Sequence, residues 1–284
     1  MLRTVPGVAT VERWARSGRP LLIEVPHGAT RTAQFEALRR RLKSPLPEDL
    51  VDFFHVNTDS GAPEIGRAIA EATDRAVVLL VSEIPRTFVD CNRVLDASKD
   101  AYAEGKVTPG MGPWITDPDD DRMLRDLHAQ YTRLVDEAIA GTMAADGTAL
   151  LLHTYGPRTV DVDVGLDIGA RMRHAYERPE QWPLRPEIDV IARTTEGELL
   201  ADARVVDSLM EAGRSLGLEV AVSATYPIHP TSHAWRHSRA WPGRVACVEV
   251  RRDLVADPFE PFEEMRIDRA AVSRIGQAFA RALA

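Results

Sequence analysis

Two histidines lie at the ends of two apolar segments, where an imidazole could bind a metal ion. Residues 21–25 lead into Pro26-His27-Gly28, and residues 149–152 lead into His153-Thr154-Tyr155-Gly156. Both segments are short and almost continuously apolar, as is typical of strands that are covered on both faces. Imidazole is the commonest zinc ligand, and a strand end holds it rigidly. A single histidine of this kind is more often part of the core, but the pair predicts a metal site.

A carboxylate is the third ligand that such a metal site needs, and two candidates lie between the histidines in the sequence. Asp59 and Glu64 belong to a polar segment that leads into an expected helix at residues 64–72, with Pro63 as a good first-turn residue. Aspartate is also a common helix N-cap. From the residues alone, Asp59 is therefore either a metal ligand or a cap.

A further carboxylate stands inside an apolar segment near the C-terminus. Glu249 is the one charged residue of Val245-Ala246-Cys247-Val248-Glu249-Val250. Glutamate is rarely buried without a partner. Because burial raises the pKa of a carboxyl group towards neutral pH, a Glu249 that faces a metal site would be a candidate general base.

An arginine that could bind a substrate carboxylate follows the apolar residues 76–81. In the segment at residues 85–93, the guanidinium group of Arg93 offers two parallel hydrogen-bond donors. Asp90 and Asn92 are short polar residues that could orient it. A surface arginine is the alternative interpretation.

Three more histidines recur every four residues at His229, His233 and His237, a spacing that would align them on a helix. Pro230 argues against a helix at this point. We favour substrate contact by His233 or His237 over a separate metal site. The alternative is a surface loop that packs on its own aromatic residues.

These side chains require a scaffold in which strands and helices alternate. Strand-like apolar runs occur at residues 21–25, 76–81, 149–152, 188–192, 218–222 and 245–250. Helices are expected at residues 34–43, 64–72, 119–145 and 201–216, and from Asp268 to about residue 283. The alternation predicts an α/β three-layer sandwich with a mixed, mainly parallel central sheet flanked by helices. Ligands of such sheets bind at the carboxyl ends of the strands.

The chain has 284 residues and no internal repeat, so we expect a single catalytic domain over residues 1–284. Long segments near residues 94–118 and 159–186 are rich in Gly, Pro, Asp and Arg, and they lack a clear period. Segments of this length inside a domain are usually functional. We therefore expect them to be loops that form walls or lids over the strand ends.

Composition argues against several classes of partner. The 35 Lys and Arg against 43 Asp and Glu give a net charge of −8, so binding to nucleic acid is not expected. The sequence lacks a run of 18 uncharged apolar residues and an apolar signal segment near its start, which predicts a cytoplasmic protein without membrane contact. Two cysteines, Cys91 and Cys247, exclude a disulfide framework and a cysteine-based zinc site.

Several of these segments, in the same order, resemble the N-formylglutamate amidohydrolases, relatives of the zinc carboxypeptidases and the aspartoacylase-like deacylases. Pro26-His27-Gly28 looks like the family's PHSG, and residues 85–93 are very close to its PRAYVDVNR. Residues 248–254 resemble its IEINR-x-L, and Thr58-Asp59 with Glu64-Ile65 is similar to its SED-x-x-V-D-E-L. His153 falls where its D-x-H-S histidine should be. The resemblance spans residues 21–254.

The resemblance implies a phosphorylase/hydrolase-like fold and an amidase that depends on zinc or another divalent metal. His27, His153 and Asp59 would bind the metal, with Glu64 as the second choice for the carboxylate. Glu249 would be the general base. Arg93, with Asn92 beside it, would bind the carboxylate of a small acidic N-acyl amino acid such as N-formylglutamate.

Two segments depart from the family pattern, so the substrate could differ. The residues around His153 lack the family's acidic and serine neighbours, and residues 226–237 replace PYAGGY-x-T-x-H without its glycine pair. The alternatives are a carboxypeptidase- or aspartoacylase-like deacylase for a larger acyl-amino acid, and a non-catalytic relative that binds a small molecule. The sequence leaves the oligomeric state open.

Overall fold

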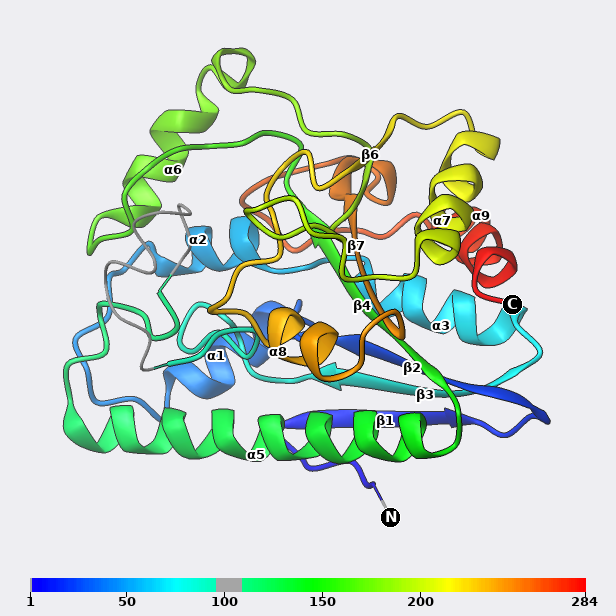
Figure 1. Cartoon of the computed structure of the whole chain (residues 1–284). Coiled ribbons are helices and arrows are strands. Elements are labelled where there is room, and N and C mark those ends of the chain that lie inside the picture. Colours follow the sequence, from blue (N-terminus) through cyan, green and yellow to red (C-terminus); the bar gives the residue numbers. More distant parts are fainter. Residues whose placement is uncertain (1, 96–108) are drawn as a thin grey trace.

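The structure is a computed structural model that describes residues 2–95 and 109–284. Among these residues, seven strands form one sheet in the order β1-β3-β2-β4-β7-β5-β6, with helices on both faces (Figure 1). The strands are β1 (Ala9–Trp14), β2 (Gly18–Val25), β3 (Arg75–Ser82), β4 (Thr148–Tyr155), β5 (Ile188–Val190), β6 (Val220–Val222) and β7 (Val245–Arg251).

The centre of the sheet is parallel. β2 pairs in parallel with β3 and β4, and β4 pairs in parallel with β7. β1 joins β3 and β5 joins β7 in antiparallel pairs, while β6 is parallel to β5. The central strands are buried on both faces, which is why their sequences are continuously apolar. The prediction of a mixed, mainly parallel sheet is confirmed.

Helices cover the sheet in two layers. They are α1 (Thr32–Arg39), α2 (Leu50–Asn57), α3 (Ala62–Ala72), α5 (Pro118–Ala144), α6 (Ile168–Tyr176), α7 (Ala203–Ser215), α8 (His233–Ala240) and α9 (Arg269–Ala282), with short 3₁₀ turns η1 (Pro179–Gln181) and η2 (Arg252–Leu254). One apolar cluster joins α1, α2, α5, α6 and α8 to one face of the sheet. A second cluster joins α3, α7 and α9 to the other face. The three-layer sandwich is thus confirmed.

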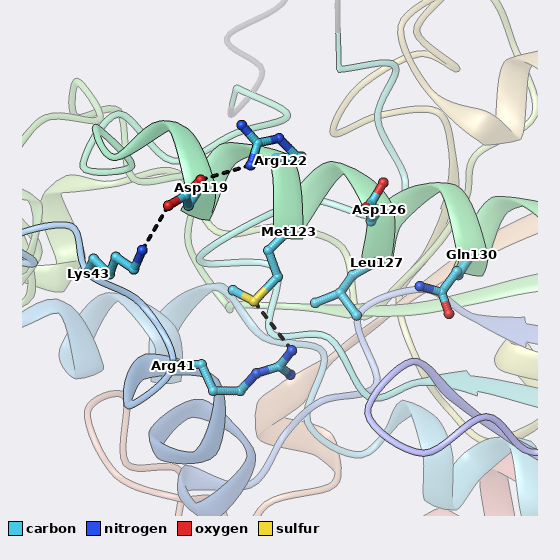
Figure 2. Close-up of a pocket in the computed structure, with 8 residues that line it drawn as sticks. All are labelled: Arg41, Lys43, Asp119, Arg122, Met123, Asp126, Leu127 and Gln130. Atoms are coloured by element: carbon cyan, nitrogen blue, oxygen red, sulfur yellow. Dashed lines mark hydrogen bonds and ion pairs between the residues drawn. The ribbon is translucent and has the colours of Figure 1, made fainter.

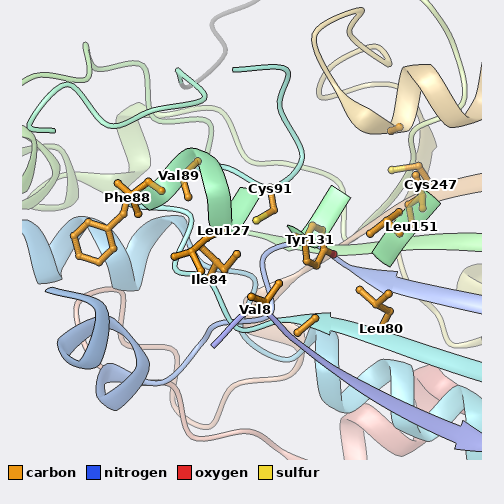
Figure 3. Packing of buried hydrophobic residues seen from close by; sticks show 14 of the residues in the cluster. Val8, Leu80, Ile84, Phe88, Val89, Cys91, Leu127, Tyr131, Leu151 and Cys247 are labelled. Carbon is orange, nitrogen blue, oxygen red and sulfur yellow. The ribbon is translucent and has the colours of Figure 1, made fainter. Parts of the chain in front are cut away.

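Neighbouring residues of a strand contribute to opposite clusters, because side chains alternate across a sheet. Leu151 of β4 packs in the first cluster, together with Leu80 and Tyr131 (Figure 3), whereas Leu150 packs in the second. The same alternation places Glu24 of β2 on the face that carries the first cluster. There its carboxylate accepts a hydrogen bond from the Tyr131 hydroxyl at 2.8 Å.

Every apolar run that we predicted as a strand coincides with one, but the sequence missed β1. β1 is an antiparallel edge strand, and most of its residues are only partly buried. A half-exposed edge strand carries charged residues such as Glu12 and Arg13 and lacks the apolar run used to find the others. The eight-residue helix α2 was also missed.

The long loop expected near residues 159–186 contains a helix that the sequence analysis did not predict. This segment contains α6, whose buried Ile168, Met172 and Ala175 have helical spacing and belong to the side that packs towards α2. The abundance of Gly, Asp and Arg around them concealed this pattern. Of the other predicted lid, near residues 94–118, residues 96–108 lie outside the described part of the chain, and Trp114 of the remainder is buried.

The prediction from Pro230 against a helix holds for His229, which lies outside any helix, but not for His233 and His237, which lie on α8. α8 begins at His233, three residues after the proline, and the Ser232 hydroxyl caps it by accepting the Trp235 amide hydrogen at 3.1 Å. The role of both predicted loops as lids and the single catalytic domain over residues 1–284 stay predictions. Within the described ranges, each helix is either too short or too polar to span a bilayer.

Candidate metal centre

Neighbouring parallel strands bring the two histidines to one edge of the sheet. Glu24 of β2 pairs with Leu151 of β4, so His27, just beyond the end of β2, lies close to the end of β4, where His153 lies. On the far side of β4, His153 is directly paired with Glu249 of β7. These are the carboxyl ends of the strands, where α/β sheets bind their ligands.

The two imidazoles converge on one carboxylate oxygen. Asp59 Oδ2 lies 3.2 Å from Nδ1 of His27 and 2.9 Å from Nδ1 of His153, and the ring centroids are 5.2 Å apart. All three residues are at most 3 % exposed. A tetrahedral zinc site with bonds of about 2.0–2.2 Å separates its ligand atoms by roughly 3.3 Å. His27, Asp59 and His153 therefore form a group that could hold a metal ion.

Asp90 determines which nitrogen of His27 is available as a ligand. Nε2 of His27 lies 2.7 Å from Asp90 Oδ1. Burial raises the pKa of Asp90, but the charges of Arg86 and His27 hold it well below its usual range, so the group is a carboxylate. A carboxylate only accepts hydrogen bonds, so Nε2 of His27 carries a hydrogen, and Nδ1 is the nitrogen that faces Asp59.

The partners of His153 are different. Burial lowers the pKa of His153, but hydrogen bonds with Asp59 and with the Cys247 thiol outweigh it and raise the pKa well above the usual value. Burial raises the pKa of Asp59, but the charges of the two histidines and their hydrogen bonds to Asp59 outweigh this effect and lower the pKa. A metal ion binds the deprotonated forms of both side chains, so metal binding would displace any proton shared between them.

Arg86 connects the two carboxylates and was not identified from the sequence. Its Nη2 lies 2.8 Å from Asp90 Oδ2, and its Nη1 lies 3.8 Å from Asp59 Oδ1. Nη1 also donates to the carbonyl of Asn57 at 3.1 Å. Its position four residues before Asp90 was the available signal, but Asp90 was expected to orient Arg93. The structure places the Asp90 carboxylate between Arg86 and His27, with the Arg93 charge near enough to act on it.

Glu249 lies beside the centre in a buried position. One carboxylate oxygen, Oε1, accepts a hydrogen bond from the Tyr226 hydroxyl, and Oε2 is buried without a hydrogen-bond partner among the described residues. Burial raises the pKa of Glu249, and the nearby Asp59 charge raises it further, against the opposing effect of His153. These are the properties that suit a general base.

The structure distinguishes Asp59 from Glu64, the two carboxylates that the sequence offered as the third metal ligand. Asp59 belongs to the converging group, whereas Glu64 lies in the first turn of α3 outside that group. Asp59 does not cap α3, because the N-cap is Gly61 at a φ of 92°, a left-handed conformation that favours glycine. A Cβ at Gly61 would also lie 2.6 Å from a methyl group of Val255.

Arg93 and Asn92 lie in a segment that is tied to the start of α8. The Val94 amide donates to the Thr231 carbonyl at 2.8 Å, and the His233 amide donates to the Asn92 carbonyl at 3.1 Å. The Arg93 charge contributes to lowering the pKa of Asp90, so this guanidinium lies near the centre. Its contact with a substrate stays a prediction.

His237 lies on α8 against α5, outside the His27–Asp59–His153 group. Its Nε2 is 3.9 Å from Asp136 Oδ1 and 3.4 Å from an Arg236 nitrogen. Burial lowers the pKa of His237 to about 4 and that of His233 to about 3, so both imidazoles are neutral at pH 7. Contact between His237 and a substrate stays a prediction.

A surface pocket on the outer side of α5 is separate from this centre (Figure 2). Three of its charged residues are paired with one another: Asp119 lies 2.8 Å from both Lys43 and Arg122. None of the residues that line it belongs to the converging group. We therefore assign the candidate centre to the strand ends.

The fold and the three converging side chains define an α/β protein with a candidate metal centre at the carboxyl ends of its strands. Residues 19–256 match the model of the N-formylglutamate amidohydrolase family. The chain therefore belongs to this family of amidohydrolases, and the resemblance found in the sequence is confirmed. No curated protein matches the chain in sequence.

Solved structures support the same fold. The gene product Atu2144 from Agrobacterium tumefaciens has 18% sequence identity and a TM-score of 0.59, over 100% of this chain and 98% of that one. The N-formylglutamate amidohydrolase from Ralstonia eutropha JMP134 has 17% identity and a TM-score of 0.61, over 98% of both chains. At these identities the likeness extends to the fold alone.

Proposed function

We propose that this protein is a metal-dependent amidohydrolase that cleaves the amide C–N bond of a small N-formyl or other N-acyl amino acid. The observation that carries the proposal is the convergence of two imidazoles and one carboxylate on a single point at the strand ends. Family membership supports the amide bond as the target. The name of the Ralstonia protein suggests N-formylglutamate as the first substrate to test.

The residues present suit zinc or another divalent metal. Two neutral imidazoles and one carboxylate are a donor set found in catalytic zinc sites, which keep one position open for water or substrate. The Asp90 carboxylate on Nε2 of His27 is the kind of partner that orients such a ligand. When bound, the metal would lower the pKa of water to about 7 and polarise the substrate carbonyl.

Glu249 would transfer a proton from the attacking water to the leaving amine. Its unpartnered Oε2 would accept a proton as water attacks the amide carbon, and would then deliver it to the departing amine nitrogen. The hydrogen bond from Tyr226 to Oε1 would keep the carboxylate in one rotamer during both transfers. Arg86 would hold Asp59 and Asp90 in place through its two terminal nitrogens.

Arg93 would bind the substrate carboxylate, with Asn92 and His237 as further contacts. A guanidinium group donates two parallel hydrogen bonds to a carboxylate, and both are charge-assisted. This recognition favours a small acidic N-acyl amino acid over a neutral amide. The backbone bonds between residues 92–94 and 231–233 would keep Arg93 at a fixed distance from the centre.

Metal content and a substrate panel test the proposal. We expect about one zinc or other divalent ion per chain, and amidase activity that a chelator abolishes and added metal restores. The panel should contain N-formyl-, N-acetyl- and peptidyl-glutamate with their neutral glutamine counterparts. Preference for larger acyl groups would favour the aspartoacylase-like alternative. A metal-free protein that hydrolyses these amides would contradict the proposal, and a metal-loaded protein without activity would favour a binding role.

Replacing Arg93 by lysine should raise KM by about 10-fold or more and change kcat much less. An ammonium group cannot reproduce the two-pronged donor, and each lost hydrogen bond to a charged group costs about 1.5–3 kcal/mol. Steady-state kinetics on the best substrate of the panel measure the effect. The matched control is Arg122→Lys, because Arg122 is exposed and pairs with Asp119 on α5. An unchanged KM in Arg93→Lys would exclude the carboxylate contact.

A further inference from the structure

The last turn of α2 is held by arginines from two distant segments. The final carbonyl groups of a helix have no partner inside the helix, and they form the negative end of its dipole. Nη1 of Arg252 donates to the carbonyls of His55 and Thr58 at 3.1 and 2.8 Å, and its Nη2 donates to the carbonyl of Val56. Arg86 binds the carbonyl of Asn57 at 3.1 Å. The carbonyls of residues 55–58 are therefore all bound by guanidinium groups.

Arg252 is buried where a charge is costly. It is 4 % exposed and begins η2, directly after β7 and three residues after Glu249. An arginine remains charged in proteins, so its burial needs compensating acceptors. The α2 carbonyls supply them. Burial lowers the pKa of Arg252, and Tyr176, Asp59 and Glu249 oppose this lowering only in part.

Holding Thr58 also fixes the next residue, Asp59. The Asp59 amide donates to the His27 carbonyl at 3.3 Å, and the Thr58 hydroxyl donates to the Ala29 carbonyl at 2.9 Å. These two bonds tie the segment to the end of β2. Arg252 ties it to the end of β7, so the backbone that carries the Asp59 carboxylate is fixed from both sides.

We propose that Arg252 is a positioning residue of the metal centre. Its guanidinium fixes the end of α2 so that the Asp59 carboxylate meets the two histidines, and it thereby links the metal ligands to the strand that carries Glu249. The inference rests on the proposed metal site and assigns Arg252 no contact with substrate. A lysine cannot take over this role, because one ammonium nitrogen cannot reach three carbonyls held by two guanidinium nitrogens.

Zinc affinity of the full-length protein, measured by competition with a chelator, tests this role. We expect Arg252→Ala to bind Zn²⁺ about 10–100-fold more weakly than the unaltered protein, the range found when groups that orient metal ligands are lost. Guanidinium ion at about 50 mM, far below denaturing concentrations, should restore most of the affinity by filling the vacated space. Arg252→Lys, which retains the charge and the buried stem, should also bind weakly, and guanidinium should not restore it.

Arg75 provides the matched control. Its side chain donates to the carbonyls of Arg19, Pro20 and Leu283 at 2.9, 2.7 and 2.6 Å, at the opposite end of the sheet. Arg75→Ala should lower the melting temperature and leave Zn²⁺ affinity unchanged. A folded Arg252→Ala or Arg252→Lys protein with normal affinity would overturn the inference, as would an equal loss of affinity in Arg75→Ala. If the unaltered protein fails to bind Zn²⁺, the proposed function itself is wrong.

Discussion

Glu249→Gln is expected to lower kcat by about 10²–10⁴-fold while the protein retains its metal. Glutamine has nearly the same shape as glutamate and can still accept the Tyr226 hydrogen bond at its amide oxygen. It has no basic oxygen for a proton from water, so only the proton transfer is lost. Kinetics with the best amide substrate, together with metal analysis of the same sample, measure the effect.

The pH dependence provides a second measure of the same group. Burial raises the pKa of Glu249 above the ordinary 4.5. A general base must be deprotonated, so kcat/KM should fall as pH decreases through this raised pKa, and the acid limb should lie above pH 4.5. In Glu249→Gln that limb should disappear or move.

A strand glutamate outside the centre is the control for Glu249. Glu12 lies on the edge strand β1, where both of its carboxylate oxygens accept hydrogen bonds from Arg67. Glu12→Gln should leave kcat unchanged, with at most a small loss of stability from the partly exposed ion pair. Near-normal turnover by metal-loaded Glu249→Gln would remove Glu249 from the role of base and leave the metal site intact.

Three of the side chains that the sequence identified, those of His27, His153 and Glu249, share one property, which is their position on or just after a buried strand. His27 and His153 could be found because continuous apolar runs mark central strands, and the carboxyl ends of neighbouring parallel strands meet at one edge. Glu249 could be found because a charge inside such a run needs a partner. For these residues, local pattern and the general rules of α/β sheets are sufficient.

The supporting arginines could not be found in this way. Arg252 acts through backbone carbonyls of α2, as Arg86 does in part, and a carbonyl acceptor cannot be recognised from residue type. α2 itself was not expected, so nothing in the sequence indicated that its last turn would need donors. Asp90 was assigned to Arg93 because they are close in sequence, whereas the fold brings His27 to it from 63 positions away.

The choice between Asp59 and Glu64 shows what only the fold determines. Both residues belong to one polar segment, and helix capping gave Asp59 an equally good alternative role. Gly61 at the N-cap of α3 removes the need for an aspartate cap. The bound α2 carbonyls on one side and this glycine turn on the other direct Asp59 towards the histidines.

Asp59→Ala is accordingly expected to weaken metal binding by about 10²–10³-fold and to abolish metal-dependent activity at ordinary metal concentrations. Zinc sites with four protein ligands bind with roughly 10–16 kcal/mol, which is about 2.5–4 kcal/mol for each ligand. A factor of ten corresponds to about 1.4 kcal/mol. Chelator competition with Zn²⁺ measures the loss, and thermal unfolding of the metal-free protein shows whether the variant is folded.

Glu64→Ala is the decisive control, because Glu64 is the alternative carboxylate and lies on the first turn of the neighbouring helix. It should bind Zn²⁺ with normal affinity, since its side chain lies outside the converging group. Asp59→Ala should in addition lower the pKa of His153, because the hydrogen bond that raises that pKa is removed. The reverse result, with metal lost in Glu64→Ala and retained in a folded Asp59→Ala protein, would transfer the third ligand to Glu64 and refute the geometry on which the proposed centre depends.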